Sequence, residues 1–165
     1  MMERYESAVR NALLRGVSCS IKNSSREHAA IILREMLKAS QSSFHAYARA
    51  LSHDVWNSET IAALEDAKRR GVDVRLLIEN DCDAETAKEL PPLLCALIRK
   101  VRYVDDKGAR PNNFAVADGC ALRFETDPVQ RSAIFFPRNL KLSRKAESLF
   151  CDLYLTAETD VVRAA

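Results

Sequence analysis

The sequence predicts an α/β fold in which a mixed, mostly parallel β-sheet is flanked by helices. The first observation is a strand–helix–strand unit over residues 43–78, whose strands pair in parallel through a right-handed crossover. The second is an Asp-Gly pair at 118–119 between two short apolar runs, which is typical of a β-hairpin. The third is helical spacing of apolar residues before, between and after these strands.

The chain before this unit favours two helices and a short strand. Residues 3–15 have helical spacing and Gly16 ends that helix, while residues 17–22 indicate a short strand. A serine at 24 or 25 then caps a helix that runs to about Ala39. The apolar face of this helix contains Ala29, Ile32, Leu33, Met36 and Leu37.

In the strand–helix–strand unit, residues 43–49 alternate polar and apolar side chains, as a strand does. A helix from 55 or 58 to 70 follows, and Gly71 suits the position after its C-terminus. Residues 72–78 form the second strand, with the continuous apolar end of a buried position. Beyond it we expect a short helical region at 83–90, a helix over 93–99 and a strand at 101–104.

The second half of the chain favours antiparallel strands and a closing helix. Residues 114–117 and 121–124 are the strands of the hairpin, and residues 131–136 add a third neighbouring strand. A helix begins at about Ser143. Its apolar stripe consists of Ala146, Leu149, Phe150, Leu153, Tyr154 and Ala157.

Length and composition indicate one globular domain over residues 1–165, with an N-terminal helix and short strand over 1–23 and a core over 24–157. Hydrophobic residues make up 47% of the chain and charged residues 29%, and the net charge of +2 favours no class of partner by itself. No apolar run could span a bilayer and the N-terminus lacks a secretory signal. We therefore expect a cytoplasmic protein without a membrane contact.

The five cysteines are scattered and include no Cys-x-x-Cys pair. This pattern indicates neither a zinc site nor a disulfide framework. We expect reduced, mostly buried thiols, and the sequence gives no indication of a metal or cofactor. The cysteines are Cys19, Cys82, Cys95, Cys120 and Cys151.

The segment Ala67-Lys-Arg-Arg-Gly71-Val-Asp-Val-Arg-Leu-Leu77 joins the predicted helix to the second parallel strand. With the strand and loop before it, this segment resembles the first half of a phospholipase D-like domain. Asp118-Gly119 lies where that family's His-x-Lys-x-x-x-x-Asp motif would end, and the closing helix resembles the family's last segment. The resemblance covers residues 24–157 and implies one half of a phospholipase D-like fold.

The resemblance fails at the residues that carry activity. Alignment on Asp118 puts Pro111 in place of the family's nucleophilic His and Asn113 in place of its Lys, and Glu125-Thr126 replaces a Gly-Ser pair. Phosphodiester transfer in the family needs imidazoles for attack and leaving-group protonation, and a cation for the phosphoryl charge. The resemblance therefore implies a pseudoenzyme without catalytic residues. Its vestigial site comprises Pro111, Asn113, Asp118 and Gly119.

Two histidines leave open an enzyme with a relocated site. His45 lies on the first parallel strand and His53 in the loop after it, and both could approach the carboxyl edge of the sheet, where open α/β sheets bind ligands. We favour a structural role for each because the sequence identifies no charged partner. His28, in the second helix, is interpreted in the same way.

Acidic residues after the second parallel strand could supply oxygen ligands to a divalent cation. Glu79, Asp81 and Asp83 lack the glycine and the distal glutamate of a calcium loop, so we interpret them as turn and helix-cap residues and predict no metal site. Asp105-Asp106 indicates another turn, and Cys120 shows no nucleophile signature.

Two basic groups suggest phosphate binding. In the family fold both would approach the face where the substrate phosphate lies, so a cationic groove for DNA or RNA could survive loss of the catalyst. The alternative is an ordinary solvated surface. The groups are Arg99, Lys100, Arg102, Lys107 and Arg110, and Arg138, Lys141, Arg144 and Lys145.

Single-motif members of the family generally pair two halves across their active sites, and this chain has the length of one half. The resemblance therefore implies a binding or scaffolding subunit that forms a homodimer or docks in a larger complex. By association alone, that complex would be of bacterial defence or mobile-element type. Two alternatives stay open: a non-specific nucleic-acid-binding module, and a phosphodiesterase or nuclease with a relocated site.

Overall fold

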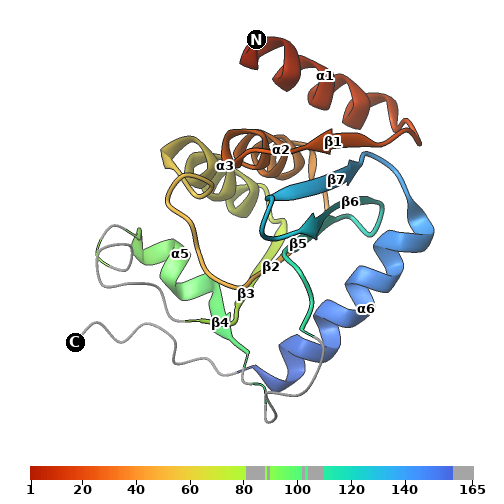
Figure 1. Ribbon diagram of the computed structural model, residues 1–165. Helices are drawn as coiled ribbons and strands as arrows, with labels where there is room; N and C mark the ends of the chain where they lie inside the picture. The colour runs from red at the N-terminus through yellow and green to blue at the C-terminus, as the bar shows by residue number, and fades with distance from the viewer. Residues whose placement is uncertain (81–87, 89, 102, 104–109, 158–165) are drawn as a thin grey trace.

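The computed structural model describes residues 1–80, 88, 90–101, 103 and 110–157. In this part of the chain one seven-stranded sheet has the order β1-β7-β6-β5-β2-β3-β4 (Figure 1). The strands are β1 Ile21–Asn23, β2 Ser43–Ala48, β3 Asp73–Ile78, β4 Ile98–Lys100, β5 Phe114–Ala117, β6 Ala121–Asp127 and β7 Ser132–Phe136. The helices are α1 Met2–Arg15, α2 Arg26–Ala39, α3 Ser58–Arg69, α5 Pro92–Leu97 and α6 Leu140–Thr156.

The sheet is mixed, as predicted, but antiparallel pairing predominates. β2 pairs in parallel with β3, and β3 pairs in parallel with β4. The pairs β1–β7, β7–β6, β6–β5 and β5–β2 are antiparallel. Short turns between β5, β6 and β7 reverse the chain, whereas longer connections containing α3 and α5 return it in the same direction. The expectation of mostly parallel pairing is corrected accordingly.

Helices cover both faces of the sheet, and α1 lies outside α2 (Figure 1). One hydrophobic core joins α1, α2, α3 and α5 to one face, and a second joins α6 to the other. Because α1 covers its outer side, α2 is buried continuously from residue 29 to residue 37 rather than along one face. This burial includes Arg34 and Glu35, two charged residues that need compensating partners.

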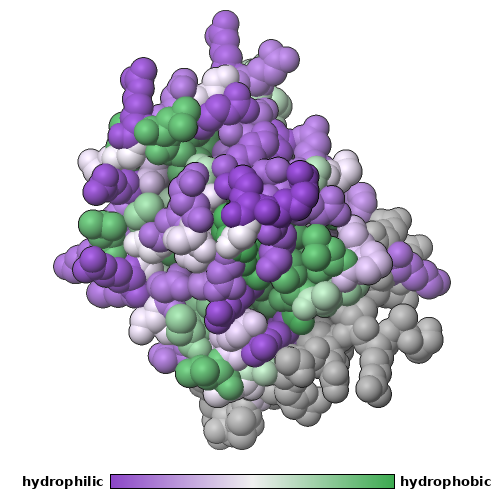
Figure 2. All heavy atoms as spheres, turned by 180° about the vertical axis from the view of Figure 1, so that it is seen from behind, coloured by the Kyte–Doolittle hydropathy of each residue, from purple (hydrophilic) through white to green (hydrophobic). Residues whose placement is uncertain are grey.

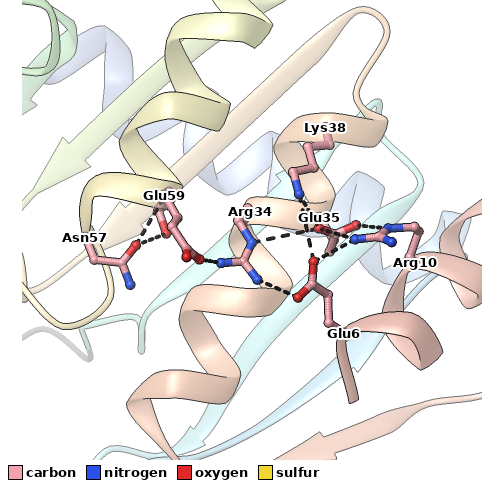
Figure 3. Close-up of polar contacts among 8 residues, drawn as sticks. Glu6, Arg10, Arg34, Glu35, Lys38, Asn57 and Glu59 are labelled. Atoms are coloured by element: carbon pink, nitrogen blue, oxygen red, sulfur yellow. Dashed lines mark hydrogen bonds and ion pairs between the residues drawn. The ribbon is translucent and has the colours of Figure 1, made fainter. Parts of the chain in front are cut away.

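A network of ion pairs joins α1, α2 and α3 (Figure 3). Arg10 of α1 donates through Nε to Glu35, 2.8 Å away, and Arg34 of α2 pairs with Glu6 at 2.9 Å and with Glu59 of α3. Lys38 also donates to Glu35, at 2.8 Å. The network therefore compensates the charges that α1 buries when it packs on α2.

Local signals in the sequence correctly predict several chain reversals and helix ends. Gly16 ends α1 with a left-handed φ of 57°, and the Ser25 hydroxyl caps α2 by accepting the N–H of His28 at 3.1 Å. In the hairpin, Asp118 and Gly119 have φ values of 51° and 62°. Two consecutive positive φ values match the turn geometry that suits the twist of paired strands.

Several predicted bounds are corrected. The strand expected at 101–104 is β4 at Ile98–Lys100. Residues 98 and 99, which the sequence assigned to the preceding helix, instead pair with β3. The first strand begins at Ile21, and α6 begins at Leu140 because Asn139 caps it. Leu149, assigned to the apolar stripe of α6, is 40% exposed. Of the helical region expected at 83–90, only Lys88 and Leu90 lie within the described residues.

The described cysteines are free, but the expectation of mostly buried thiols is wrong for them. Cys19 and Cys151 are exposed, while Cys95 and Cys120 are half-buried. Cys82 lies outside the described residues. Within the described part of the chain, no helix has the length and apolarity needed to cross a membrane.

Candidate anion-binding site

The predicted vestigial site is divided between opposite edges of the sheet. β5 runs antiparallel to β2, with Phe114 beside Tyr47 and Ala117 beside Phe44. Residues that precede β5 therefore lie at the carboxyl edge, where β2 and β3 end, whereas the Asp118-Gly119 turn lies at the amino edge. The four residues of β5 separate the two groups by about 13 Å. The structure does not bring Asp118 and Gly119 together with Pro111 and Asn113.

Asp118 has a structural environment at the amino edge. Its carboxylate accepts the N–H groups of Gln41, Ser42 and Ser43 at 2.8–2.9 Å, and it also accepts the Ser42 hydroxyl. Burial alone would raise the pKa of Asp118, but these hydrogen bonds outweigh it and hold the pKa below its ordinary value. The carboxylate thus ties the hairpin to the chain entering β2.

Asn113 has the corresponding role at the carboxyl edge. Its Oδ1 accepts the N–H of Arg49 at 2.8 Å, and its own N–H donates to Glu125 at 3.3 Å. These bonds connect the end of β2, the start of β5 and the middle of β6. Pro111 is half-buried two residues away and does not line the cavity described next.

A cavity of about 530 Å³ opens at this carboxyl edge. It lies between the N-terminus of α2, the loop that follows β2, and strands β2, β5 and β6, and Asn113 is among the residues that line it. Its volume is in the usual range of ligand sites. Its charged lining consists of Arg26, Arg49, Arg123 and Arg131, with Asp54 and Glu125. His53 also lines it.

Arg123 is the most deeply placed of these cations. It is 8% exposed, and its terminal NH2 group makes only a long hydrogen bond, 3.4 Å, to Asn23. Its Nε has no hydrogen-bond partner. Burial lowers the pKa of Arg123 by penalising the charged form, while the nearby Glu125 opposes the change. A buried guanidinium with an unused donor is costly unless a further anion accepts from it.

The rest of the lining also favours an anion. Arg26 is paired with Asp54 at 2.6 Å, and Glu125 lies near Arg123, so the four guanidinium groups outnumber the two carboxylates. Arg49 has an Nε without a partner. Ser25 and Arg26 bring the N-terminus of α2, a helix of 14 residues, to the cavity. A helix N-terminus carries partial positive charge, which adds to the field of the arginines.

The sequence does not indicate these arginines as a group. Arg26, Arg49, Arg123 and Arg131 lie far apart in the chain and form no basic run. Spacing along β6 gives no signal for Arg123, because Arg123 alternates with the apolar Leu122 and Phe124 and is therefore expected to face solvent, whereas the structure buries it. A charge at such a position needs an explanation.

The described residues of the two predicted basic groups lie in separate parts of the structure. Arg99 lies over the ring of Tyr154 at 4.1 Å, near the end of α6, and Arg110 pairs with Glu79. The second basic group, Arg138, Lys141, Arg144 and Lys145, is exposed around the start of α6. The start of α6 lies beside Cys120, at the amino edge of the sheet. The described members of these groups do not line the cavity: Arg99, Lys100, Arg110, Arg138, Lys141, Arg144 and Lys145. Arg102 and Lys107 lie outside the described residues.

The two histidines proposed for a relocated site are also apart. His45 is buried against α6, where Nδ1 lies 2.5 Å from Glu147, the ring stacks on Phe150, and Nε2 faces Asp73 at 3.6 Å. His53 is exposed and lines the cavity, on the other face of the sheet. The charged partners of His45, which the sequence did not reveal, come from β3 and α6. His28 is half-buried and stacks on Tyr5.

Glu79 belongs to a separate polar cluster at the end of β3. It is 8% exposed, pairs with Arg110 and accepts the Tyr47 hydroxyl at 3.1 Å. Asp81, Asp83 and Asp105-Asp106 lie outside the described residues. Among the residues that are described, no group of three His, Cys, Asp or Glu side chains could hold a metal ion.

Comparison with solved structures identifies the fold as phospholipase D-like. Nuc from Salmonella typhimurium, a phospholipase D family member, matches with a TM-score of 0.60 and 13% identity, over 85% of this chain and 96% of Nuc. NucT from Helicobacter pylori matches with a TM-score of 0.60 and 9% identity, over 86% of this chain and 98% of NucT.

A third similar structure is TrmBL2, an archaeal chromatin protein with a novel mode of DNA binding. It matches with a TM-score of 0.62 and 14% identity, over 94% of this chain and 62% of TrmBL2. No family model and no curated protein matches the sequence. At these identities the likeness establishes the fold alone.

Proposed function

We propose that this protein is a catalytically inactive phospholipase D-like domain that binds phosphate groups of nucleic acid through the carboxyl-edge cavity, as a subunit of a larger assembly. The observation that carries the proposal is the buried, incompletely partnered Arg123 in a cavity with more guanidinium groups than carboxylates. Arginine donates hydrogen bonds to phosphate oxygens in a fixed geometry, which makes it well suited to this ligand. TrmBL2, with a similar fold, is described as binding DNA.

The chemistry of the residues at the family's catalytic positions supports the absence of catalysis. Pro111 offers no nucleophile, and the Asn113 side chain carries no charge and accepts the backbone N–H of Arg49 through Oδ1. A phosphate bound beside these residues would be held by charge without an imidazole at the family's nucleophile position. His53 is the imidazole that lines the cavity, and a relocated active site would depend on it.

Binding can be tested by fluorescence anisotropy with a labelled single-stranded oligonucleotide at low salt. We expect Arg123→Met to weaken binding by about tenfold or more, because it removes a charge-assisted hydrogen bond. Arg49→Met should also weaken binding. Because Arg49 is less buried than Arg123, this second variant tests the cavity even if Arg123→Met fails to fold. Lys141→Met is the matched control, since it removes the same charge from an exposed site outside the cavity.

The outcomes separate the alternatives. Unchanged affinity in both cavity variants would refute the proposal. A large loss in Lys141→Met alone would instead assign binding to the basic surface at the start of α6. Cleavage of the oligonucleotide that disappears in His53→Ala would replace the binding function with a relocated active site.

A scaffolding function is the second candidate, favoured by exposed apolar side chains. Leu140, Leu142 and Leu149 of α6 are 38–44% exposed, and Phe124 of β6 is 40% exposed. On the face seen in Figure 2, however, hydrophobic side chains form separate areas among hydrophilic ones. Scattered exposure of this kind is common on monomers, so phosphate binding has the stronger support.

A further inference from the structure

We propose that the cavity binds the terminal phosphomonoester at the end of a nucleic-acid strand, rather than an internal phosphodiester. This inference rests on the function proposed above. The two ligands differ in shape and charge. An internal phosphate continues into the chain on both sides, whereas a terminal phosphate is attached on one side only. A monoester also carries more negative charge, about −1.5 to −2 near neutral pH, than the single charge of a diester.

The depth of the site favours a ligand that enters by its end. Ala29 and Leu33 of α2 and Ala46 and Ala115 of the sheet line the cavity, and each is at most 6% exposed. The cavity therefore reaches between α2 and the sheet to side chains that are otherwise covered. Arg123 lies on the sheet side of this space and is 8% exposed. A strand that ran past the opening would keep its phosphates in solvent, away from Arg123.

The walls of the site restrict a continuous strand further. The sheet forms the floor, α2 forms one side, and the loop after β2 contributes Leu51 and Trp56, which are 8% and 5% exposed. An internal phosphate at Arg123 would need space for two chain segments that leave in different directions. A terminal phosphate needs space for one, and about 530 Å³ is sufficient for a nucleotide-sized group.

The charge of the lining matches a dianion. Four guanidinium groups face two carboxylates, one of which, Asp54, is already paired with Arg26. The unused Nε donors belong to Arg49, in the loop that follows β2, and to Arg123, in β6. The N-terminus of α2 adds a further positive end on the third side. Donors on separate elements that line one cavity suit a phosphate whose oxygens are free on several sides.

The test compares oligonucleotides of one sequence that differ only in their ends: linear with a 5′-phosphate, linear with a 3′-phosphate, linear without a terminal phosphate, and circular. We expect at least one phosphorylated form to bind about tenfold tighter than the unphosphorylated and circular forms. Arg123→Met and Arg49→Met should abolish this difference, whereas Lys141→Met should retain it. A mononucleotide competitor distinguishes a strand end from a free nucleotide.

Failure of this inference is distinguishable from failure of the proposed function. If circular DNA binds as tightly as phosphorylated linear DNA, and Arg123→Met weakens both equally, the phosphodiester is the ligand and the end-binding inference is overturned. If no oligonucleotide binds the wild-type protein, both proposals are refuted. If a mononucleotide alone binds as tightly as the phosphorylated strand, the assignment to a strand end is overturned.

Discussion

At the scale of single residues, two charged side chains have opposite environments: Asp118 is half-buried and Arg123 is buried. Asp118 has three backbone N–H donors and a hydroxyl, so its charge is stabilised within the chain. Arg123 has one long hydrogen bond and an unused Nε. A satisfied charge indicates a structural role, whereas an incompletely satisfied one is a cost that a ligand can remove. This contrast, rather than the family motif, identifies the candidate site.

We predict that Asp118→Asn lowers the free energy of unfolding by about 1–2 kcal/mol, since asparagine tolerates the positive φ but weakens the hydrogen bonds. The pKa of Asp118 is lowered by folding, so its contribution is present above the unfolded pKa of about 3.9 and is lost as the pH falls through the folded pKa. Urea unfolding at pH 7 and pH 3 measures both effects. A variant deficit that is as large at pH 3 as at pH 7 would contradict this account.

At the scale of elements, the attachment of α1 depends on charge as well as on apolar packing. Val9 is fully buried in the core, and Arg10 beside it reaches Glu35 of α2. β1, which follows α1, pairs with β7 and so occupies one edge of the sheet. The segment assigned by sequence to 1–23 therefore contributes to the same core and the same sheet as the residues that follow it.

We predict that Glu35→Gln destabilises the protein by about 1–3 kcal/mol, because it leaves Arg10, Arg34 and Lys38 without their shared carboxylate. Glu65→Gln on the exposed surface of α3 is the matched control and should change stability by less than about 0.5 kcal/mol. Thermal and urea unfolding measure the difference. Equal effects of the two variants would show that the network does not hold α1.

The same network predicts that the attachment of α1 to α2 depends on pH. Burial alone would raise the pKa of Glu35, but hydrogen bonds from Arg10 and Lys38 outweigh it and lower the pKa. The stabilisation is thus present above the unfolded pKa of about 4.3 and is lost as the pH falls through the folded value. Below a pH of about 4.3, the protection of α1 amides from hydrogen exchange, taken relative to the intrinsic exchange rate at each pH, should therefore fall more in wild type than in Glu35→Gln. No difference between the two proteins would exclude Glu35 as the titrating group.

At the scale of the whole molecule, the two edges of the sheet have different environments. The amino edge is closed by the Asp118 hydrogen bonds and the start of α6, while the carboxyl edge carries the cavity. Ligand binding at the carboxyl edge agrees with the general behaviour of open α/β sheets. Of the described basic residues expected to form one groove, Arg99 lies near the last turn of α6, whereas Arg138, Lys141, Arg144 and Lys145 lie around its start.

Homodimerisation stays a prediction, and light scattering tests it. If the exposed leucines of α6 form the contact, wild type should have twice the chain mass, and Leu142→Lys with Leu149→Lys should have the mass of one chain. Leu14→Lys, at a residue that is 76% exposed on α1, is the matched control and should not change the mass. A wild-type monomer at micromolar concentration would remove the homodimer hypothesis.

The sequence by itself determined the local structure well. Gly16, Ser25 and the Asp118-Gly119 pair mark chain reversals and helix ends through backbone geometry that depends on neighbouring residues only. The parallel pairing of β2 and β3 also followed from the sequence, since a helical crossover returns the chain in one direction. These features need no knowledge of distant contacts.

Tertiary structure alone decided the site. The sequence aligned Pro111, Asn113 and Asp118 as one vestigial pocket, but β5 holds the last of these at the opposite edge of the sheet from the other two. The arginines of the cavity come from α2, the loop after β2, β6 and the turn before β7, and only folding brings them together. Charge interactions depend on distance in space and on burial, neither of which can be obtained from spacing along the chain.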